Sequence, residues 1–225
     1  MRFAPGIFKK ILKFGSPPGL EGLFGLGAFN YFILVMNSYG SVVGAAVSIT
    51  INWDSMFFIP MLGAQFATTS LVGRYMGAKD VESAKRVVIT SFTLMVLYSA
   101  VIITLFLSMN HVFINLFLTK MGNAGEVSPL ATTMLKLACL YLVADAAHLS
   151  FEGALRGAGD TKVSMYIFVT ITLIFAVLIY TFVENRLVSP IGAWLIFVGF
   201  AIALGLGMFL RYLQGKWKHI NLIDN

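Results

Sequence analysis

Charged residues are scarce in this sequence of 225 residues, at 12% of the chain against about 25% in an ordinary soluble domain. Hydrophobic residues make up 58%, so too few charges remain to cover a surface exposed to water. The same scarcity excludes a disordered chain and a coiled coil, both of which are rich in charge. The single cysteine, Cys139, cannot form an internal disulfide, which excludes a small secreted domain held by disulfides. The composition therefore predicts a protein that crosses a lipid bilayer several times.

Long runs without charge predict six membrane-spanning helices, because about 20 apolar residues are needed to cross the hydrocarbon layer. The predicted spans cover about residues 19–37, 42–76, 82–108, 129–156, 162–184 and 190–212. They make up one transmembrane unit, residues 16–214, between a basic amphipathic arm at 1–15 and a tail at 215–225. We expect the arm to be no cleavable signal peptide, since it has no sustained apolar core. A turn is expected over residues 37–41, and residues 111–118 are expected to continue the third span at the membrane interface.

Residues typical of helix ends separate the spans. Gly77 is expected to end the second span in the left-handed conformation, and Asp80 to cap the third. Pro129 is expected to open the fourth span after a polar loop, and Ser189-Pro190 to open the sixth.

The stretch Arg156-Gly157-Ala158-Gly159-Asp160 is expected to form a structural turn between the fourth and fifth spans. It also contains the G-x-G-D pattern of intramembrane aspartyl proteases. A protease dyad requires two facing carboxyl groups that share a proton, whereas Asp160 lies between Arg156 and Lys162 and is expected to cap a helix. Zinc-ligand spacing and nucleotide-binding motifs are also missing. We therefore expect no enzyme and no cofactor.

The basic residues are distributed unevenly between the two sides of the predicted spans. Thirteen of the sixteen lysines and arginines fall on one side. These are Arg2, Lys9, Lys10, Lys13, Arg74, Lys79, Lys85, Arg86, Arg156, Lys162, Arg211, Lys216 and Lys218. The positive-inside rule therefore predicts a multi-pass protein of the cell (inner) membrane with both termini in the cytoplasm. This distribution also accounts for the net charge of +6 without a nucleic-acid partner.

Four polar residues recur on one face of the predicted span 129–156, namely Tyr141, Asp145, His148 and Glu152. Counted from Arg156 at 1.5 Å per residue, Asp145 lies about 16 Å inside, close to the middle of a roughly 30 Å core. A carboxylate at that depth costs roughly 2.5–3.5 kcal/mol on insertion scales. Asp145 must therefore face protein or a water-filled cavity.

For each residue of this face, a structural interpretation stays open beside a functional one. Asp145 either binds a cation or forms a hydrogen bond between helices. Tyr141 either shares an ion or proton with that carboxylate or packs in the bundle. His148 either relays protons or is simply hydrogen-bonded. Glu152 either lines the cavity or forms an i,i+4 ion pair with Arg156.

Two further acidic residues lie in other spans. Glu21 is either the favourable anion at the start of a helix or part of the same cavity as Asp145. Asp54 is 20 residues from Arg74, about 30 Å along a straight helix, which favours a charge at the outer boundary over a place in the cavity.

Several segments resemble the multidrug and toxic compound extrusion (MATE) family of transporters. Residues 153–161, Gly-Ala-Leu-Arg-Gly-Ala-Gly-Asp-Thr, resemble a signature of that family. Ser16–Gly22 resembles the opening of its seventh helix. Pro60, Gly63 and residues 71–73 and 77–78 resemble its eighth helix and the following turn. The resemblance covers nearly the whole chain and corresponds to the second of two six-helix lobes.

The resemblance implies an all-α lobe of a multidrug efflux antiporter, which exports organic, often cationic, drug-like compounds in exchange for Na⁺ or H⁺. In Na⁺-coupled relatives, a glutamate of the seventh helix and a tyrosine and an aspartate of the tenth form the cation site. These positions match Glu21, Tyr141 and Asp145. Apart from the resemblance, the positions of His148, Glu152 and Asp54 in the predicted spans make them further candidates for the cavity. The resemblance also implies a partner, either a missing first six-helix lobe or a second copy.

Two other functions stay open from the sequence. A flippase or exporter of lipid-linked or polysaccharide cargo shares the architecture but needs a cationic groove for anionic headgroups, and the central charges here are carboxylates. A non-transporting membrane subunit, or a decayed half-transporter, would use the carboxylates only for bonds between helices.

Overall fold

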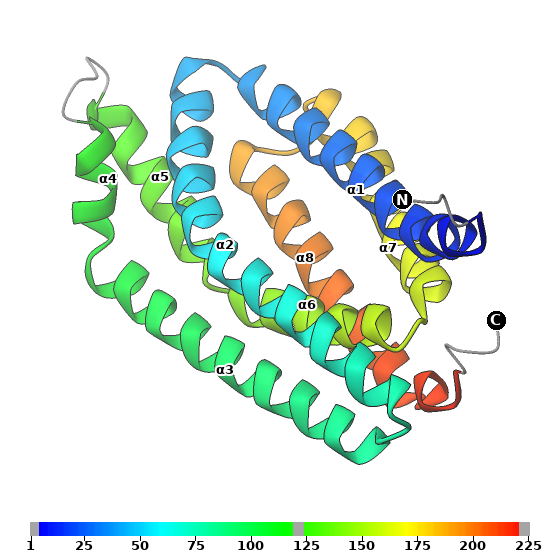
Figure 1. Ribbon diagram of the computed structural model, residues 1–225. Coiled ribbons are helices and arrows are strands. Elements are labelled where there is room, and N and C mark those ends of the chain that lie inside the picture. The colour runs from blue at the N-terminus through cyan, green and yellow to red at the C-terminus, as the bar shows by residue number, and fades with distance from the viewer. Residues whose placement is uncertain (1–4, 119–123, 221–225) are drawn as a thin grey trace.

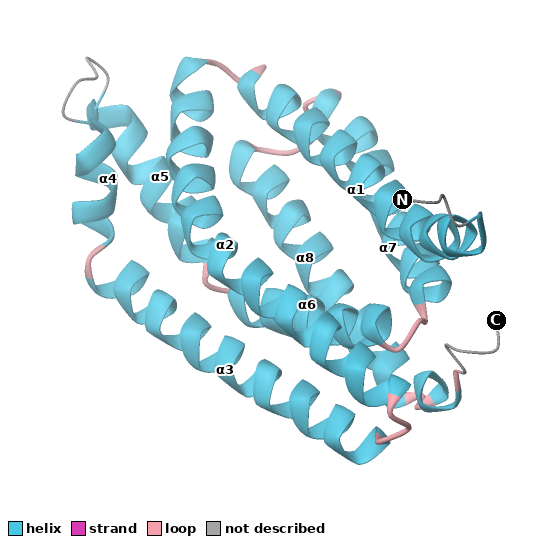
Figure 2. Ribbon diagram, in the orientation of Figure 1, coloured by secondary structure: helices cyan, strands magenta, loops and turns pink. Residues whose placement is uncertain are grey.

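The computed structural model describes residues 5–118 and 124–220, and every element within them is a helix (Figures 1 and 2). This confirms the predicted fold class. The helices are α1 (Pro5–Asn37), α2 (Ser41–Gly77), α3 (Val81–Ser108), α4 (Asn110–Leu118), α5 (Ala124–Ala138), α6 (Leu142–Gly157), α7 (Thr161–Leu178) and α8 (Pro190–Leu213). A π-helical segment, η1 (Ile179–Glu184), continues α7, and a short 3₁₀-helix, η2 (Lys216–His219), follows α8.

Five stretches of helix are long and apolar enough to cross a membrane: Gly15–Asn37, Ser41–Gly77, Val81–Ser108, Thr161–Glu184 and Pro190–Leu213. The pair α5 and α6, bent by 44°, is sufficient for a crossing only when the two helices are taken together. These stretches cover the six predicted spans. Where the membrane begins and ends along them stays a prediction, as do the arm and the tail, whose residues 1–4 and 221–225 lie outside the described residues.

Two of the predicted helix starts are confirmed by hydrogen bonds. The backbone N–H of Ser83 donates to the Asp80 carboxylate over 3.0 Å, which caps α3 and lowers the pKa of that carboxyl. The Ser189 hydroxyl accepts from the backbone N–H of Gly192 over 3.2 Å, and Pro190 occupies the first turn of α8. The predicted turn between α1 and α2 is also present.

Other predicted boundaries are wrong. The left-handed residue after α2 is Lys79, with φ 59°, and not Gly77. The left-handed position of the turn over residues 78–80 therefore lies two residues after the expected one. Pro129 lies inside α5, which already begins at Ala124, so this helix starts five residues earlier than the proline suggests. Residues 111–118 do not continue the third span but belong to the separate helix α4.

The predicted span 129–156 is broken in the structure. The chain leaves helical geometry after Ala138 and re-enters it at Leu142. Neither proline nor glycine occurs between these residues, so the usual local causes of a kink are absent from the sequence. The break turns one expected helix into two and places Tyr141 at the start of α6.

Helix α6 packs against α2, α3 and α8 at the centre of the bundle, while α3 runs along its edge (Figure 1). Glycines permit the closest approaches. A Cβ at Gly157 would lie 2.5 Å from the carbonyl oxygen of Thr69 in α2, and one at Gly205 of α8 would lie 2.5 Å from that of Ala144 in α6. Such small residues let helix backbones pack tightly in membranes. The polar side chains of α6 are therefore enclosed by other helices.

The outside of the bundle carries many exposed apolar side chains. These include Leu23, Leu26, Leu34, Ile59, Ile89, Leu97, Val101, Leu195 and Leu210. An extended apolar surface of this kind is typical of a protein in contact with a membrane.

Candidate functional site

A cavity of about 300 Å³ lies between α1, α2, α6, α7 and α8, and we call it the carboxylate pocket. Two carboxylates, Asp54 and Asp145, reach it together with Tyr141 and His148. Most of the remaining wall is aromatic or small, consisting of Gly25, Phe29, Ser55, Phe58, Phe168, Phe197, Phe200, Ala201 and Leu204. Among the described residues, neither lysine nor arginine lines this pocket. The pocket is therefore acidic and apolar at once.

Tyr141 joins two helices at this pocket. Its hydroxyl donates a hydrogen bond of 3.0 Å to Oδ1 of Asp54 in α2, and its ring packs edge-on against Phe197 of α8 at a centroid distance of 5.6 Å. Because Tyr141 stands at the N-cap position of α6 and is fully buried, the break before α6 fixes the position of the phenol.

Asp145 lies in the first turn of α6, where the helix dipole favours a negative charge. Its backbone N–H donates to the carbonyl of Tyr141 over 2.8 Å, and only 9% of the residue is exposed. Within residues 5–118 and 124–220, its carboxylate has neither a hydrogen bond nor an ion pair. A carboxylate at such a site strongly attracts cations, since the surrounding apolar medium screens charge poorly.

A second polar group, which we call the Arg156 cluster, consists of Glu21, Gln65, Glu152 and Arg156. The Arg156 guanidinium donates to Glu152 Oε1 over 2.6 Å and also to Glu21 Oε2. Gln65 of α2 donates to the other oxygen of Glu152 over 2.5 Å. Both glutamates are almost fully buried, with 2% and 3% exposed, so one guanidinium compensates two buried carboxylates.

His148 lies between the pocket and the Arg156 cluster. It lines the pocket, where its ring stacks on Phe168 at 6.0 Å, and its Nε2 lies 3.5 Å from Oε2 of Glu152. That nitrogen has no hydrogen-bond partner among the described residues. The side chain of His148 thus contacts both polar groups.

The structure brings together some of the predicted site residues and separates others. Tyr141, Asp145 and His148 line one pocket, and Asp54 joins them there, so the geometry agrees with the cavity interpretation of Asp54 and not with a charge at the boundary. Glu21 neither begins a helix, since α1 starts at Pro5, nor lines the pocket. Both expectations for Glu21 are therefore corrected by its ion pair with Arg156.

Glu152 forms the predicted i,i+4 ion pair with Arg156 and does not line the pocket. The turn that follows departs in part from expectation. Gly159 adopts φ 86°, a conformation that favours glycine, whereas Gly157 is required for close approach to α2. Asp160 stands at the N-cap of α7, but its side chain makes no capping bond and instead accepts from Arg211 Nε over 2.8 Å.

Gln65 is a site residue that the sequence analysis missed. A signal was present, because an uncharged amide in an apolar span also needs a hydrogen-bond partner. The aromatic wall, by contrast, had no local signal, since the chain contains 20 phenylalanines and only the fold selects those that face the pocket. Within the described residues, no group of three His, Cys, Asp or Glu side chains is arranged to hold a metal ion.

The family model MatE matches residues 17–181, nearly three quarters of the chain. The chain belongs to the MATE family. Similar curated proteins are the probable multidrug resistance protein NorM of Thermotoga maritima, 28% identical over 93% of this chain and 45% of its own length, and that of Brucella suis, 29% identical over 93% and 44%. The multidrug resistance protein MdtK of Yersinia pseudotuberculosis is 27% identical over 94% of this chain and 46% of its own.

Solved structures show the same relationship in the fold. A MATE protein in complex with MaL6 superimposes with a TM-score of 0.85 at 20% identity, covering 98% of this chain and 50% of the other. A MOP superfamily transporter from Pyrococcus furiosus gives a TM-score of 0.82 at 21% identity, covering 97% and 49%. The chain thus spans about half the length of the relatives it matches.

Family membership confirms several expectations. The chain is a multi-pass membrane protein and a half-length homologue of the multidrug resistance transporters. The family is not enzymatic, which confirms the expectation that this chain is not an enzyme. Antiporters of this family are coupled to Na⁺ or H⁺.

Proposed function

We propose that this chain is the carboxy-terminal six-helix lobe of an antiporter that exports organic, often cationic, compounds in exchange for Na⁺ or H⁺. The observation that carries the proposal is the carboxylate pocket, in which two aspartates and a phenol face an aromatic wall without a compensating lysine or arginine. The resemblance of residues 16–22 and 153–161 to the seventh helix and the later signature of the family supports the choice of lobe.

Tyr141 and Asp145 are proposed to bind the coupling cation, with Asp54 as a third oxygen ligand. Na⁺ is a hard cation that prefers oxygen ligands, and a proton can occupy either carboxylate. A cationic substrate competes for the same negative charge, and the phenylalanines offer it cation–π contacts. Because binding of one cation disfavours the other, the two are exchanged without ATP.

Glu21, His148 and Glu152 are proposed to act beside this site. Glu21 is held by Arg156, so it reaches a cation in the pocket only after that ion pair opens. His148 contacts both the pocket and Glu152, which makes it the group that passes a proton between them. In this proposal the three residues take part in ion coupling without contacting the bound cation directly.

The transport cycle needs a second lobe, because alternating access in such transporters comes from rocking of two repeats around a central site. We propose a first six-helix lobe or a second copy of this chain as the partner. The excess of basic residues on one side supports cytoplasmic termini in the cell membrane. The acidic pocket disfavours an anionic lipid-linked or polysaccharide cargo.

The proposal is tested by cation binding to the purified chain and by efflux from proteoliposomes in which it is combined with a first lobe. Asp145→Asn should abolish ethidium efflux driven by either a Na⁺ or a pH gradient, imposed separately. Asp80→Asn is the matched control, since Asp80 is exposed and only caps α3. Unchanged ion-driven efflux in the Asp145 variant would refute the assignment of Asp145 as the residue that binds the coupling cation.

A further inference from the structure

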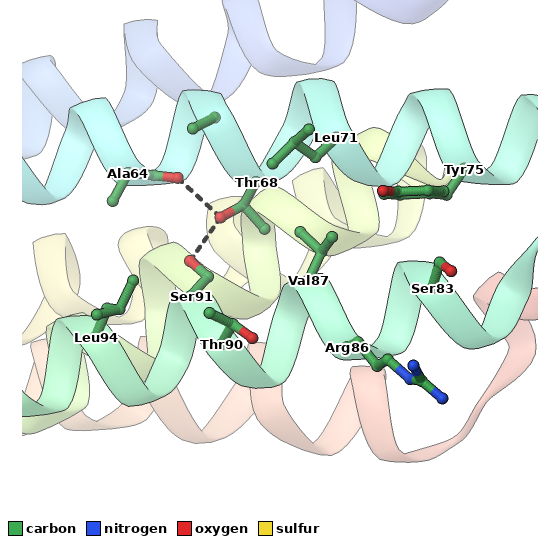
Figure 3. Close-up of a pocket in the computed structure, with 11 residues that line it drawn as sticks. Ala64, Thr68, Leu71, Tyr75, Ser83, Arg86, Val87, Thr90, Ser91 and Leu94 are labelled. Carbon is green, nitrogen blue, oxygen red and sulfur yellow. Dashed lines mark hydrogen bonds between the residues drawn. The ribbon is translucent and has the colours of Figure 1, made fainter.

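A second cavity, of about 470 Å³, lies between α2 and α3, and we call it the α2–α3 groove. It shares no lining residue with the carboxylate pocket. Its walls are Ala64, Ala67, Thr68, Leu71 and Tyr75 from α2 and Ser83, Arg86, Val87, Thr90, Ser91 and Leu94 from α3 (Figure 3). The proposed transport function leaves this cavity without a role.

The groove exists because the facing side chains are small. Ala64, Ala67, Thr68 and Ser91 leave a hollow where larger residues would fill the space between the two helices. The hydroxyls of Thr68 and Ser91 are bonded to each other over 2.6 Å, and that of Thr68 also contacts the carbonyl of Ala64 over 2.8 Å (Figure 3). Since these two hydroxyls are engaged, the middle of the groove can accept an apolar chain at little cost.

The groove changes character along its length. Tyr75, Ser83 and Arg86 gather at the end near the α2–α3 turn (Figure 3). Beyond them the rim is largely apolar, with Leu71 42% and Leu94 61% exposed, and the exposed Thr90 adds one hydroxyl to it. At 1.5 Å per residue, the eleven-residue steps from Ser83 to Leu94 and from Ala64 to Tyr75 correspond to about 16 Å, close to the half-thickness of a roughly 30 Å hydrocarbon core.

Arg86 supplies the charge at the polar end. It is exposed and has no ion pair among the described residues. The charge of Arg86 also attracts both acidic neighbours in the sequence, but each has a closer partner, Lys85 at 3.0 Å for Glu82 and the N–H of Ser83 for Asp80. A cationic end with hydroxyl donors, followed by an apolar channel one leaflet long, matches an amphiphile with a phosphate headgroup.

We propose that the α2–α3 groove binds one anionic phospholipid, with its phosphate on Arg86, Ser83 and Tyr75 and one acyl chain along the groove. Charge complementarity selects the anionic headgroup, and the length of the channel selects a lipid over a free anion. The positive-inside orientation places this end at the cytoplasmic leaflet, where anionic lipids attract basic residues. The site does not depend on the carboxylate pocket and would remain if the transport proposal failed.

The test uses the purified full chain in neutral detergent, with dioleoyl phosphatidylglycerol and dioleoyl phosphatidylcholine as probes and native mass spectrometry as the readout. We expect Arg86→Gln to weaken phosphatidylglycerol binding about tenfold, as loss of a charge-assisted hydrogen bond requires, and to bring it to the level of phosphatidylcholine. Arg74→Gln is the control. It removes one positive charge from an exposed position near the α2–α3 turn but outside the groove, and should change phosphatidylglycerol binding less than about twofold.

A second pair of variants tests the channel. Ala67→Phe fills the groove and should weaken both lipids, whereas Ala100→Phe, on an exposed part of α3 outside the groove, should not. Equal losses of phosphatidylglycerol binding in the two arginine variants, or unchanged lipid binding in Ala67→Phe, would overturn the proposal. Binding would then depend on general surface charge and not on the groove. Inorganic phosphate that binds as tightly as phosphatidylglycerol would also overturn it, as would a dimer of the chain that Ala67→Phe dissociates.

Discussion

The Tyr141 hydroxyl donates a hydrogen bond of 3.0 Å to Oδ1 of Asp54, across 87 positions of sequence. The bond ties α2 to the first residue before α6, at the point where the chain has just broken out of α5. Transporters often place their ion sites at such interrupted helices near the middle of the bilayer, since helix ends there supply polar groups that a continuous helix lacks. The break and the bond together build the carboxylate pocket.

Tyr141→Phe removes this hydroxyl and keeps the ring. Loss of one hydrogen bond to a charged group should weaken Na⁺ binding by about 1.5 kcal/mol, or roughly tenfold, as measured by isothermal titration calorimetry on the purified chain. Tyr166→Phe is the control, because Tyr166 is exposed on α7 and lies outside the pocket. Equal affinities in the wild type and the Tyr141 variant would return this tyrosine to a packing role.

The two pocket aspartates should behave as one unit. Asp54→Asn and Asp145→Asn each remove a ligand of the same cation, so either change alone should strongly weaken Na⁺ binding, measured by isothermal titration calorimetry. The double variant should then lose no more than the single variants, since effects of residues that share one partner are not additive. Losses that add independently in a double-mutant cycle would show that the two carboxylates serve different ions.

Much of the fold follows from local patterns in the sequence. Apolar runs of sufficient length predict the helices, and cap residues such as Asp80 and Ser189 predict where α3 and α8 begin. The break between Ala138 and Leu142 could not be predicted, because it contains no helix breaker and its polar contact, Tyr141 to Asp54, joins distant positions. Boundaries of this kind depend on tertiary contacts that a local pattern does not contain.

The site residues also fall into those that local patterns predict and those that depend on tertiary contacts. The helical spacing of Tyr141, Asp145 and His148 is local, so their common face could be predicted, and all three line the pocket. The expectation that Asp54 lies at the outer boundary assumes a straight helix back to Arg74, although α2 contains Pro60 and bends along its course (Figure 1). The resemblance places Glu21 in the cation site, and nothing in the sequence around it indicates that Arg156 is its partner.

Arg156→Gln should destabilise the bundle by about 3 kcal/mol, because it leaves two buried carboxylates without a compensating cation. The loss should appear as a lower thermal midpoint, followed by circular dichroism in detergent. Adding Glu21→Gln to this variant should restore part of the stability, since one of the two unpaired charges is then removed. A double variant no more stable than Arg156→Gln would contradict the shared ion pair.

Gly157→Ala should separate α2 from α6. The added Cβ would lie 2.5 Å from the backbone carbonyl of Thr69, which cannot rotate away, so overpacking should cost about 1–3 kcal/mol of stability. Gly63→Ala in α2 is the matched control, since a Cβ there meets nothing within 4 Å. It should stabilise the helix slightly, because glycine is a poor helix former. Similar thermal midpoints for the two variants would argue against tight packing of α2 on α6.

The orientation in the membrane predicts which loops are reachable from outside the cell. In a chain carrying Cys139→Ala, Ala78→Cys places a thiol in the basic turn between α2 and α3, and Leu187→Cys places one in the loop between η1 and α8. Both positions are exposed, so access to the reagent and not burial should decide whether they react. A membrane-impermeant maleimide should label Leu187→Cys in intact cells and Ala78→Cys only after permeabilisation, because the positive-inside rule holds the basic turn in the cytoplasm. The reverse pattern would invert the topology. It would also move the proposed lipid to the outer leaflet, where Arg86 would find far fewer anionic headgroups to attract.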